Sequence, residues 1–207
     1  MYAEDFAGWT VSVWLPLLLY PLSSRMGTPT APPPAMLITA AFSRHDAALD
    51  WARCRAIEAW GTPVLESPSF AFRETEYYER EMGEQLTKVF WCFAPPCDPA
   101  RLAHIKRTTN EWELQCADSG LYPEARPLNL DPGYLNLGKL ILASTKDFTH
   151  RIYLSEGIFA EVTLYYKHGR WRDHEWTFPD YRREDYQAFF SECRRYLHHW
   201  IREGASV

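Results

Sequence analysis

The polar residues best suited to catalysis or ligand binding lie in one stretch of the sequence, residues 129–161. Three of them could exchange protons with a substrate as general acids or bases: Asp131, His150 and Glu161. Four more could bind a ligand through amide, carboxylate or cationic groups: Asn129, Lys146, Asp147 and Arg151. This mixture suits a small anion, because cationic side chains bind it and carboxylates orient the cations. We therefore predict a site that binds, and could turn over, a small anionic metabolite or nucleotide.

Two further candidates, Tyr78 and Glu81, lie in the sequence YYEREMG at residues 77–83. Their aromatic and carboxylate groups could close a pocket over the ligand, so they join the ligand-binding set. The plainer alternative is a short helical turn that stops at Gly83. No metal site is predicted, because no set of His, Cys and carboxylate residues has metal-ligand spacing, and no cofactor is expected.

Each candidate also has an ordinary structural alternative. Arg151 and Glu161 could form a cross-strand ion pair, which stabilises a protein by less than about 1 kcal/mol when exposed. His150 could be a hydrogen-bonded core or capping histidine. Asn129 and Asp131 could serve only as turn and cap residues. The sequence leaves these alternatives open.

A stretch of glycines and a lysine raises the question of nucleotide hydrolysis. From Gly133 the sequence reads G-x-x-x-x-G-K, but Leu140 follows where a phosphate loop needs a hydroxyl. Bulky side chains also occupy the intervening positions. Asp131 followed by Pro132 is instead typical of a helix N-terminus. We predict a helix over 132–146 and no phosphate loop.

The hydrophobic pattern predicts alternating strands and helices around these residues. Strands are expected at 36–42, 63–72, 87–94 and 126–130, and helices at 46–60, after a cap at Asp98, and at about 183–202. A β-meander is expected at 151–154, 158–166 and 170–176. This order predicts an α+β fold: a ferredoxin-like split βαβ core, extended by an additional helix, a C-terminal β-meander and a C-terminal helix.

The first hairpin of the meander determines which side chains share a face of the sheet. A turn at residues 155–157 places Arg151 opposite Glu161, and strand alternation then separates polar from apolar positions. Ile152 and Leu154 are expected to face the core. Arg151 and Glu161 are expected to contact each other on the other face.

Composition excludes one class of partner and indicates a compartment. The chain has 207 residues and a net charge of −5, whereas a nucleic-acid binder usually carries a basic face. Its five cysteines lack paired spacing, which favours reduced thiols in the cytoplasm. The apolar run at 11–22 is too short for a membrane span, and Pro16 and Pro21 interrupt it. We predict a cytoplasmic protein without nucleic-acid or membrane partners.

The first 35 residues differ in character from the rest of the chain. Met26 opens the Pro-rich stretch MGTPTAPPPAM and resembles a natural start, so residues 1–25 could arise from an upstream start codon or a lineage-specific extension. A weak signal anchor is the alternative. We predict a disordered extension and tail over 1–35 and a single α+β domain over 36–207.

Four stretches resemble a known family: NLDPGYLNLGKLILASTKDFTHRIYL, GIFAEVTLYY, WTFPDYR and YYEREMG. They resemble the bacterial domain-of-unknown-function family 4416, and the similarity runs from about Met26 to the C-terminal helix. The resemblance implies no activity and no catalytic residues. Some members carry a GTP-binding label, so a GTP-binding protein without a proper phosphate loop is one alternative function.

The other alternative is a non-enzymatic module that mediates interaction or oligomerisation. In that case an open sheet face and the C-terminal helix would form the contact, for example in a homodimer. A concave pocket lined by Arg151, Glu161 and Asp131 would favour ligand binding, and a flat aromatic face would favour the interaction module.

Overall fold

The computed structural model describes residues 29–73 and 79–204. Contacts divide the chain into two units, residues 1–31 and 32–207, and all the elements described here lie in the second. Most of the predicted N-terminal extension lies outside the described residues. The predicted ligand-binding residue Tyr78 also lies outside them. No helix in the described part of the chain is long and apolar enough to cross a membrane.

The second unit is built on a nine-stranded sheet in which every pairing is antiparallel. Its main order is β2-β4-β1-β5-β6-β8-β7, while β3 also pairs with β4 and β9 with β8. The strands are β1 (Ala35–Ser43), β2 (Leu65–Glu66), β3 (Phe70–Phe72), β4 (Leu86–Cys97), β5 (Asn129–Leu135), β6 (Lys139–Ser144), β7 (Ile152–Ser155), β8 (Ile158–Lys167) and β9 (Arg170–Asp173).

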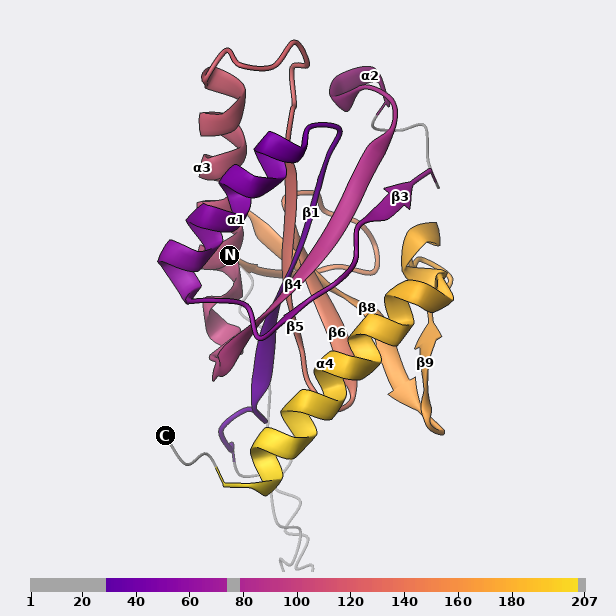
Figure 1. The fold of residues 1–207 in the computed structure, drawn as a ribbon. Helices are drawn as coiled ribbons and strands as arrows, with labels where there is room; N and C mark the ends of the chain where they lie inside the picture. The colour runs from indigo at the N-terminus through magenta and orange to yellow at the C-terminus, as the bar shows by residue number, and fades with distance from the viewer. Residues whose placement is uncertain (1–28, 74–78, 205–207) are drawn as a thin grey trace, which may run out of the picture. The chain divides into compact units, whose positions relative to one another are not determined.

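Helices cover both faces of this sheet. The helical elements are α1 (Asp46–Trp60), α2 (Glu79–Met82), η2 (Pro99–Arg101), α3 (Leu102–Asp118), η3 (Pro179–Arg182) and α4 (Glu184–Arg202). Apolar residues of α1 and α3 pack with one set of strand residues, and those of α4 pack with another set. Figure 1 shows α4 crossing the sheet obliquely, with α1 and α3 side by side away from it.

Local sequence signals explain several of these elements. The predicted helices are confirmed as α1, α3 and α4, but the strand predicted at 126–130 begins only at Asn129, as β5, and the stretch 63–72 forms two short strands, β2 and β3. The Asp98 side chain accepts a hydrogen bond from the Ala100 N–H, as a cap before Pro99 should. One stripe of α3 at helical spacing is buried: Leu102, Ile105, Thr109, Trp112 and Cys116. The apolar seam of α4 is buried against the sheet from Tyr186 to Leu197, so the core occupies it.

The α+β class is confirmed, in a nine-stranded sheet. One split βαβ unit is present, because β4, α3 and β5 follow in sequence while β1 lies between the two strands. A second comes from β1, α1 and the two-residue β2, because β4 lies between β1 and β2 and pairs antiparallel with both. The remaining strands extend the sheet beyond these two units.

The predicted helix over 132–146 is wrong, because these residues form β5, a turn and β6. Asn136 closes the hairpin. Its N–H donates to the Lys139 carbonyl oxygen, and its Oδ1 accepts from the N–H groups of Gly138 and Lys139. Gly133 lies where the strands are closest: a Cβ there would lie 2.0 Å from the Ile141 carbonyl oxygen. Asp131 therefore lies within a strand and caps no helix.

The predicted meander is confirmed in outline and wrong in part. Ile152 pairs with Ala160, but a register shift places Ser155 opposite Ile158. Ile152 is 72% exposed and Leu154 41%, so neither faces the core. The predicted contact is present: Arg151 Nε donates to Glu161 Oε2 over 2.7 Å.

The sheet opens between β5 and β6. These strands pair only at Gly133–Leu135 with Leu140–Leu142. Beyond that point, two side chains of α3 form the hydrogen bonds to the β5 backbone that β6 would otherwise form. The Leu130 N–H donates to Glu113 Oε1 at 2.8 Å, and Lys106 Nζ donates to the Leu130 carbonyl oxygen at 2.6 Å. Pro132 points its nitrogen toward the same gap, so its missing N–H costs the ladder nothing.

Candidate functional site

A cavity of about 560 Å³ lies where the sheet opens. Its walls come from β1, β3, β4, β5, β6 and β8, from the segment after β6, from η3, and from α3 through Lys106. The lining residues are Phe42, Phe72, Lys88, Lys106, Arg126, Asn129, Asp131, Leu142, Ala143, Ser144, Thr145, Lys146, Phe148, Arg151, Glu161, Phe178, Pro179, Asp180 and Tyr181. This volume is typical of pockets for small molecules.

Arg151 is held by several partners in the wall of the cavity. Its side chain is 5% exposed, and its Nη1 donates to Ser144 Oγ at 2.7 Å and to the Lys146 carbonyl oxygen at 2.8 Å. With Nε on Glu161, the guanidinium is fixed on two sides. Its Nη2 has no hydrogen-bond partner among the described residues, so this donor is open to a ligand.

The two side chains that accept from Arg151, Glu161 and Ser144, have further contacts of their own. His150 Nε2 lies 3.0 Å from Glu161 Oε2, and its ring stacks on Trp176 with centroids 5.3 Å apart. The Ser144 hydroxyl oxygen accepts from Arg151 and from the Lys146 N–H, 3.1 Å away. Because both of its lone pairs are engaged, that hydroxyl can offer a ligand only its hydrogen.

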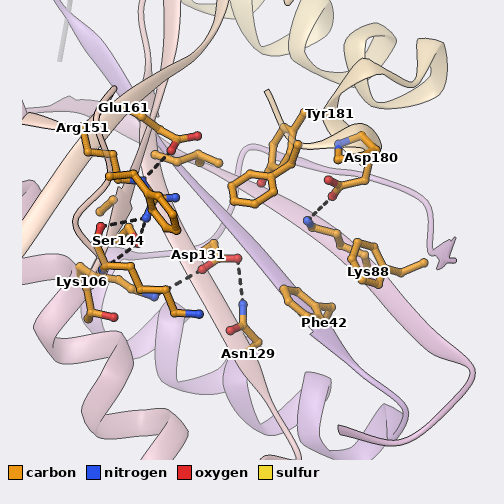
Figure 2. Close-up of a pocket in the computed structure, with 18 of the residues that line it drawn as sticks. Phe42, Lys88, Lys106, Asn129, Asp131, Ser144, Arg151, Glu161, Asp180 and Tyr181 are labelled. Atoms are coloured by element: carbon orange, nitrogen blue, oxygen red, sulfur yellow. Dashed lines mark hydrogen bonds and ion pairs between the residues drawn. The ribbon is translucent and has the colours of Figure 1, made fainter. Parts of the chain in front are cut away.

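Asp131 lies in the middle of the cavity (Figure 2), between the Arg151–Glu161 pair and the Lys88–Asp180 pair. Its Oδ2 accepts from Asn129 Nδ2 at 2.8 Å, and its side chain is 27% exposed. Burial by itself would raise the pKa of the Asp131 carboxyl. The positive charges of Lys106, Lys88 and Arg126 outweigh that effect, so the pKa is lowered and Asp131 is a carboxylate at neutral pH.

Lys88 and Asp180 form a buried ion pair on the other side. Lys88 Nζ donates to Asp180 Oδ2 at 2.6 Å, and the two side chains are 3% and 6% exposed. The ammonium group also lies 4.6 Å from the ring centroid of Tyr181 and 5.0 Å from that of Phe42. The charge of Lys88 is therefore stabilised both by one carboxylate and by the faces of aromatic rings.

Tyr181 adds a buried hydroxyl to the same wall. The residue is 2% exposed, and its hydroxyl has no hydrogen-bond partner within the described part of the chain. Burial and the nearby negative charges of Asp180, Asp131 and Glu161 raise the pKa of Tyr181 well above its usual value. The phenol is therefore neutral and able to donate a hydrogen bond.

The lining of the cavity is net positive although the chain is net negative. Five cationic side chains, Lys88, Lys106, Arg126, Lys146 and Arg151, face three carboxylates, Asp131, Glu161 and Asp180. Five positive charges less three negative ones leave about +2, against −5 for the whole sequence. Positive charge in a partly buried site is weakly screened, and Glu113 beside the lining offsets part of it by pairing with Lys106 and Arg126.

The structure brings together five of the residues predicted for the site. They line the cavity from β5, β6–β7 and β8: Asn129, Asp131, Lys146, Arg151 and Glu161. His150 touches Glu161 without lining the cavity. Asp147 and Glu81 are exposed and lie outside the lining, and only the Glu81 backbone carbonyl contacts a lining residue, through the Arg126 N–H.

Sequence reasoning missed the side chains that complete the site from elsewhere, above all Lys88, Lys106, Asp180 and Tyr181. One signal was available for two of them. Lys88 shares its strand parity with the buried Phe90, and Lys106 adjoins the buried Ile105 in α3. A lysine at a buried position requires a partner, which marks it as unusual.

In the described residues no group of three or more His, Cys, Asp or Glu could hold a metal ion.

Comparisons with known proteins place the chain in a family without a described activity. Neither the curated proteins nor the solved structures gave a significant match. One family model matches residues 33–196, a range that contains every residue lining the cavity. Because this match spans more than half of the sequence, the chain belongs to the family described as "Domain of unknown function (DUF4416)".

Proposed function

We propose that this protein binds a small anionic metabolite or nucleotide in the cavity between β5 and β6. The observation that carries the proposal is the excess of cationic side chains in the lining of a cavity of about 560 Å³. Arg151 donates through Nη1 to the Ser144 hydroxyl oxygen, so the hydroxyl hydrogen and the open Nη2 belong to two bonded neighbours, and both groups offer hydrogens. Together they form a cradle for a carboxylate or phosphate group.

The test is a thermal-shift screen of small anions on the wild-type protein and on Arg151→Lys. A ligand that binds only the folded state raises the melting temperature in proportion to its affinity. The lysine variant keeps the charge but loses the planar fork that holds Glu161, Ser144 and the ligand together. We expect anions that stabilise the wild type to lose most of their effect on this variant.

Arg53→Lys is the matched control. Arg53 also forms a forked pair with a carboxylate, donating to both oxygens of Glu66, but it lies outside the cavity. Anions that bind the cavity should stabilise this variant as they do the wild type. Equal stabilisation of Arg151→Lys by the same anions would contradict the proposed site.

A further inference from the structure

We infer that the ligand is an anion that also carries a hydrogen-bond donor, a hydroxyl or ammonium group, which it places on Asp131. This inference rests on the proposed function and narrows its ligand class. The observations that carry it are the central position of Asp131 and the groups around it. A hydroxylated or amino-bearing phosphate or carboxylate fits them, and a simple anion does not.

The carboxylate of Asp131 has unused acceptor capacity toward the cavity. Two carboxylate oxygens accept about four hydrogen bonds. Among the described residues, Asp131 accepts one hydrogen bond from Asn129 Nδ2 at 2.8 Å and a longer one from Lys106 Nζ at 3.4 Å. Lys106 also donates to the Leu130 carbonyl oxygen and lies 3.7 Å from Glu113 Oε1, as an ion pair. A ligand that covered Asp131 without a donor would bury a carboxylate whose remaining acceptor sites are unsatisfied.

Two donor groups in the cavity lining need an acceptor on the ligand. The Tyr181 hydroxyl is buried in the cavity wall without a partner in the described residues. Arg151 Nη2 likewise has no hydrogen-bond partner among them. The ligand therefore accepts from Arg151 and Tyr181 and donates to Asp131. Its anionic end and its donor are separate groups, because a fully deprotonated oxyanion accepts hydrogen bonds and donates none.

Matched pairs of small molecules test the inference. Glycerol 3-phosphate and propyl phosphate share the phosphate but differ in hydroxyl groups, and glutamate and glutarate share two carboxylates but differ in the ammonium group. Dissociation constants are measured by NMR titration of isotope-labelled full-length protein. We expect the donor-bearing member of at least one pair to bind about tenfold tighter or more than its partner. The pair that shows the preference identifies the anion as phosphate or carboxylate.

Asp131→Asn should abolish this preference, because an amide offers a weaker acceptor and brings its own donors. Asp173→Asn is the control: Asp173 is an exposed partner of Arg182 outside the cavity, so the preference should persist. Tyr181→Phe should weaken both members of a pair alike. If Asp131→Asn does not fold, the wild-type preference and the Tyr181→Phe result still decide.

Two contrary outcomes are distinguishable. If the members of each pair bind the wild type equally, or the donor-free member binds tighter, the inference about Asp131 is wrong and the anion site stands. If none of the four molecules binds the cavity, the proposed function fails, and the inference fails with it.

Discussion

At the scale of single residues, the Lys88–Asp180 pair combines strong attraction with nearly complete burial. Removing one partner leaves the other charged and desolvated, which typically costs about 3–5 kcal/mol. We expect Lys88→Met to lower the free energy of unfolding by about that amount, measured by urea denaturation. The double variant Lys88→Met/Asp180→Leu should recover much of the loss, because no buried charge is then left alone.

The surface offers a control for this pair. Arg53→Met breaks the pair with Glu66, whose side chains are 37% and 35% exposed. Since water solvates both partners, the loss should be below about 1 kcal/mol. Equal losses for Lys88→Met and Arg53→Met would show that the buried pair contributes no more than a surface pair.

Asp131 should make stability depend on acid pH. Its pKa is lowered in the folded protein, so the unfolded state binds protons more readily in the interval between the folded pKa and about 3.9, the unfolded value. The stabilisation is present above about pH 4 and is lost as the pH falls through the folded pKa. We expect wild-type stability to fall more steeply than that of Asp131→Asn as the pH falls below about 4, measured by denaturant titrations. Parallel curves would contradict the lowered pKa.

At the scale of elements, the sequence predicts the helices and strands whose buried residues recur at one regular spacing. β1, α1, β4, α3 and α4 were predicted because continuous apolar runs or helical stripes identify them. The region of β5 and β6 was mispredicted, because an Asp-Pro pair is typical of helix starts and Leu137, Leu140, Ile141 and Ser144 also fit a helical face. No local signal revealed that Glu113 and Lys106 would replace β6 beside Leu130.

The site was predictable to a similar degree, for a physical reason. Arg151 and Glu161 meet through a hairpin, whose short turn leaves few registers. Lys88, Asp180 and Tyr181 reach the cavity from elements far apart in sequence, and their meeting depends on strand order. Strand order is a property of the whole sheet, which local periodicity does not encode.

The two glycines of the β5–β6 hairpin should respond oppositely to alanine. Gly133→Ala would push a Cβ against the Ile141 backbone, so it should cost about 1–3 kcal/mol or more. Gly138 has no positive φ, and a Cβ there meets only Asn136 Oδ1, at 3.7 Å. Gly138→Ala should therefore be neutral or stabilise by up to about 1 kcal/mol, by restricting the unfolded chain. Thermal denaturation of both variants checks the contrast, and similar effects would argue against this hairpin.

At the scale of the whole second unit, the cavity lies between two parts of the sheet. The first part comprises β2, β4, β1 and β5, and the second comprises β6, β8, β7 and β9. Backbone pairing joins them at three positions. The rest of the connection is apolar: α4 packs on residues of both parts, including Phe90 and Leu164, and α3 packs on Ile141 and Ile158. A ligand in the cavity would therefore add contacts across this junction.

This arrangement predicts how a bound ligand changes hydrogen exchange. Residues 126–131 of the first part and 144–151 of the second both border the cavity, and their backbone pairing across the gap is absent. A ligand held by Arg151 on one side and Asp131 on the other should slow local opening of both segments together. We expect glycerol 3-phosphate or glutamate, whichever binds, to increase amide protection in both segments. The turn at 168–169 closes the β8–β9 hairpin outside the lining, so its amide protection should be unchanged. Protection confined to one segment would mean that the ligand contacts one part of the sheet and does not bridge the junction.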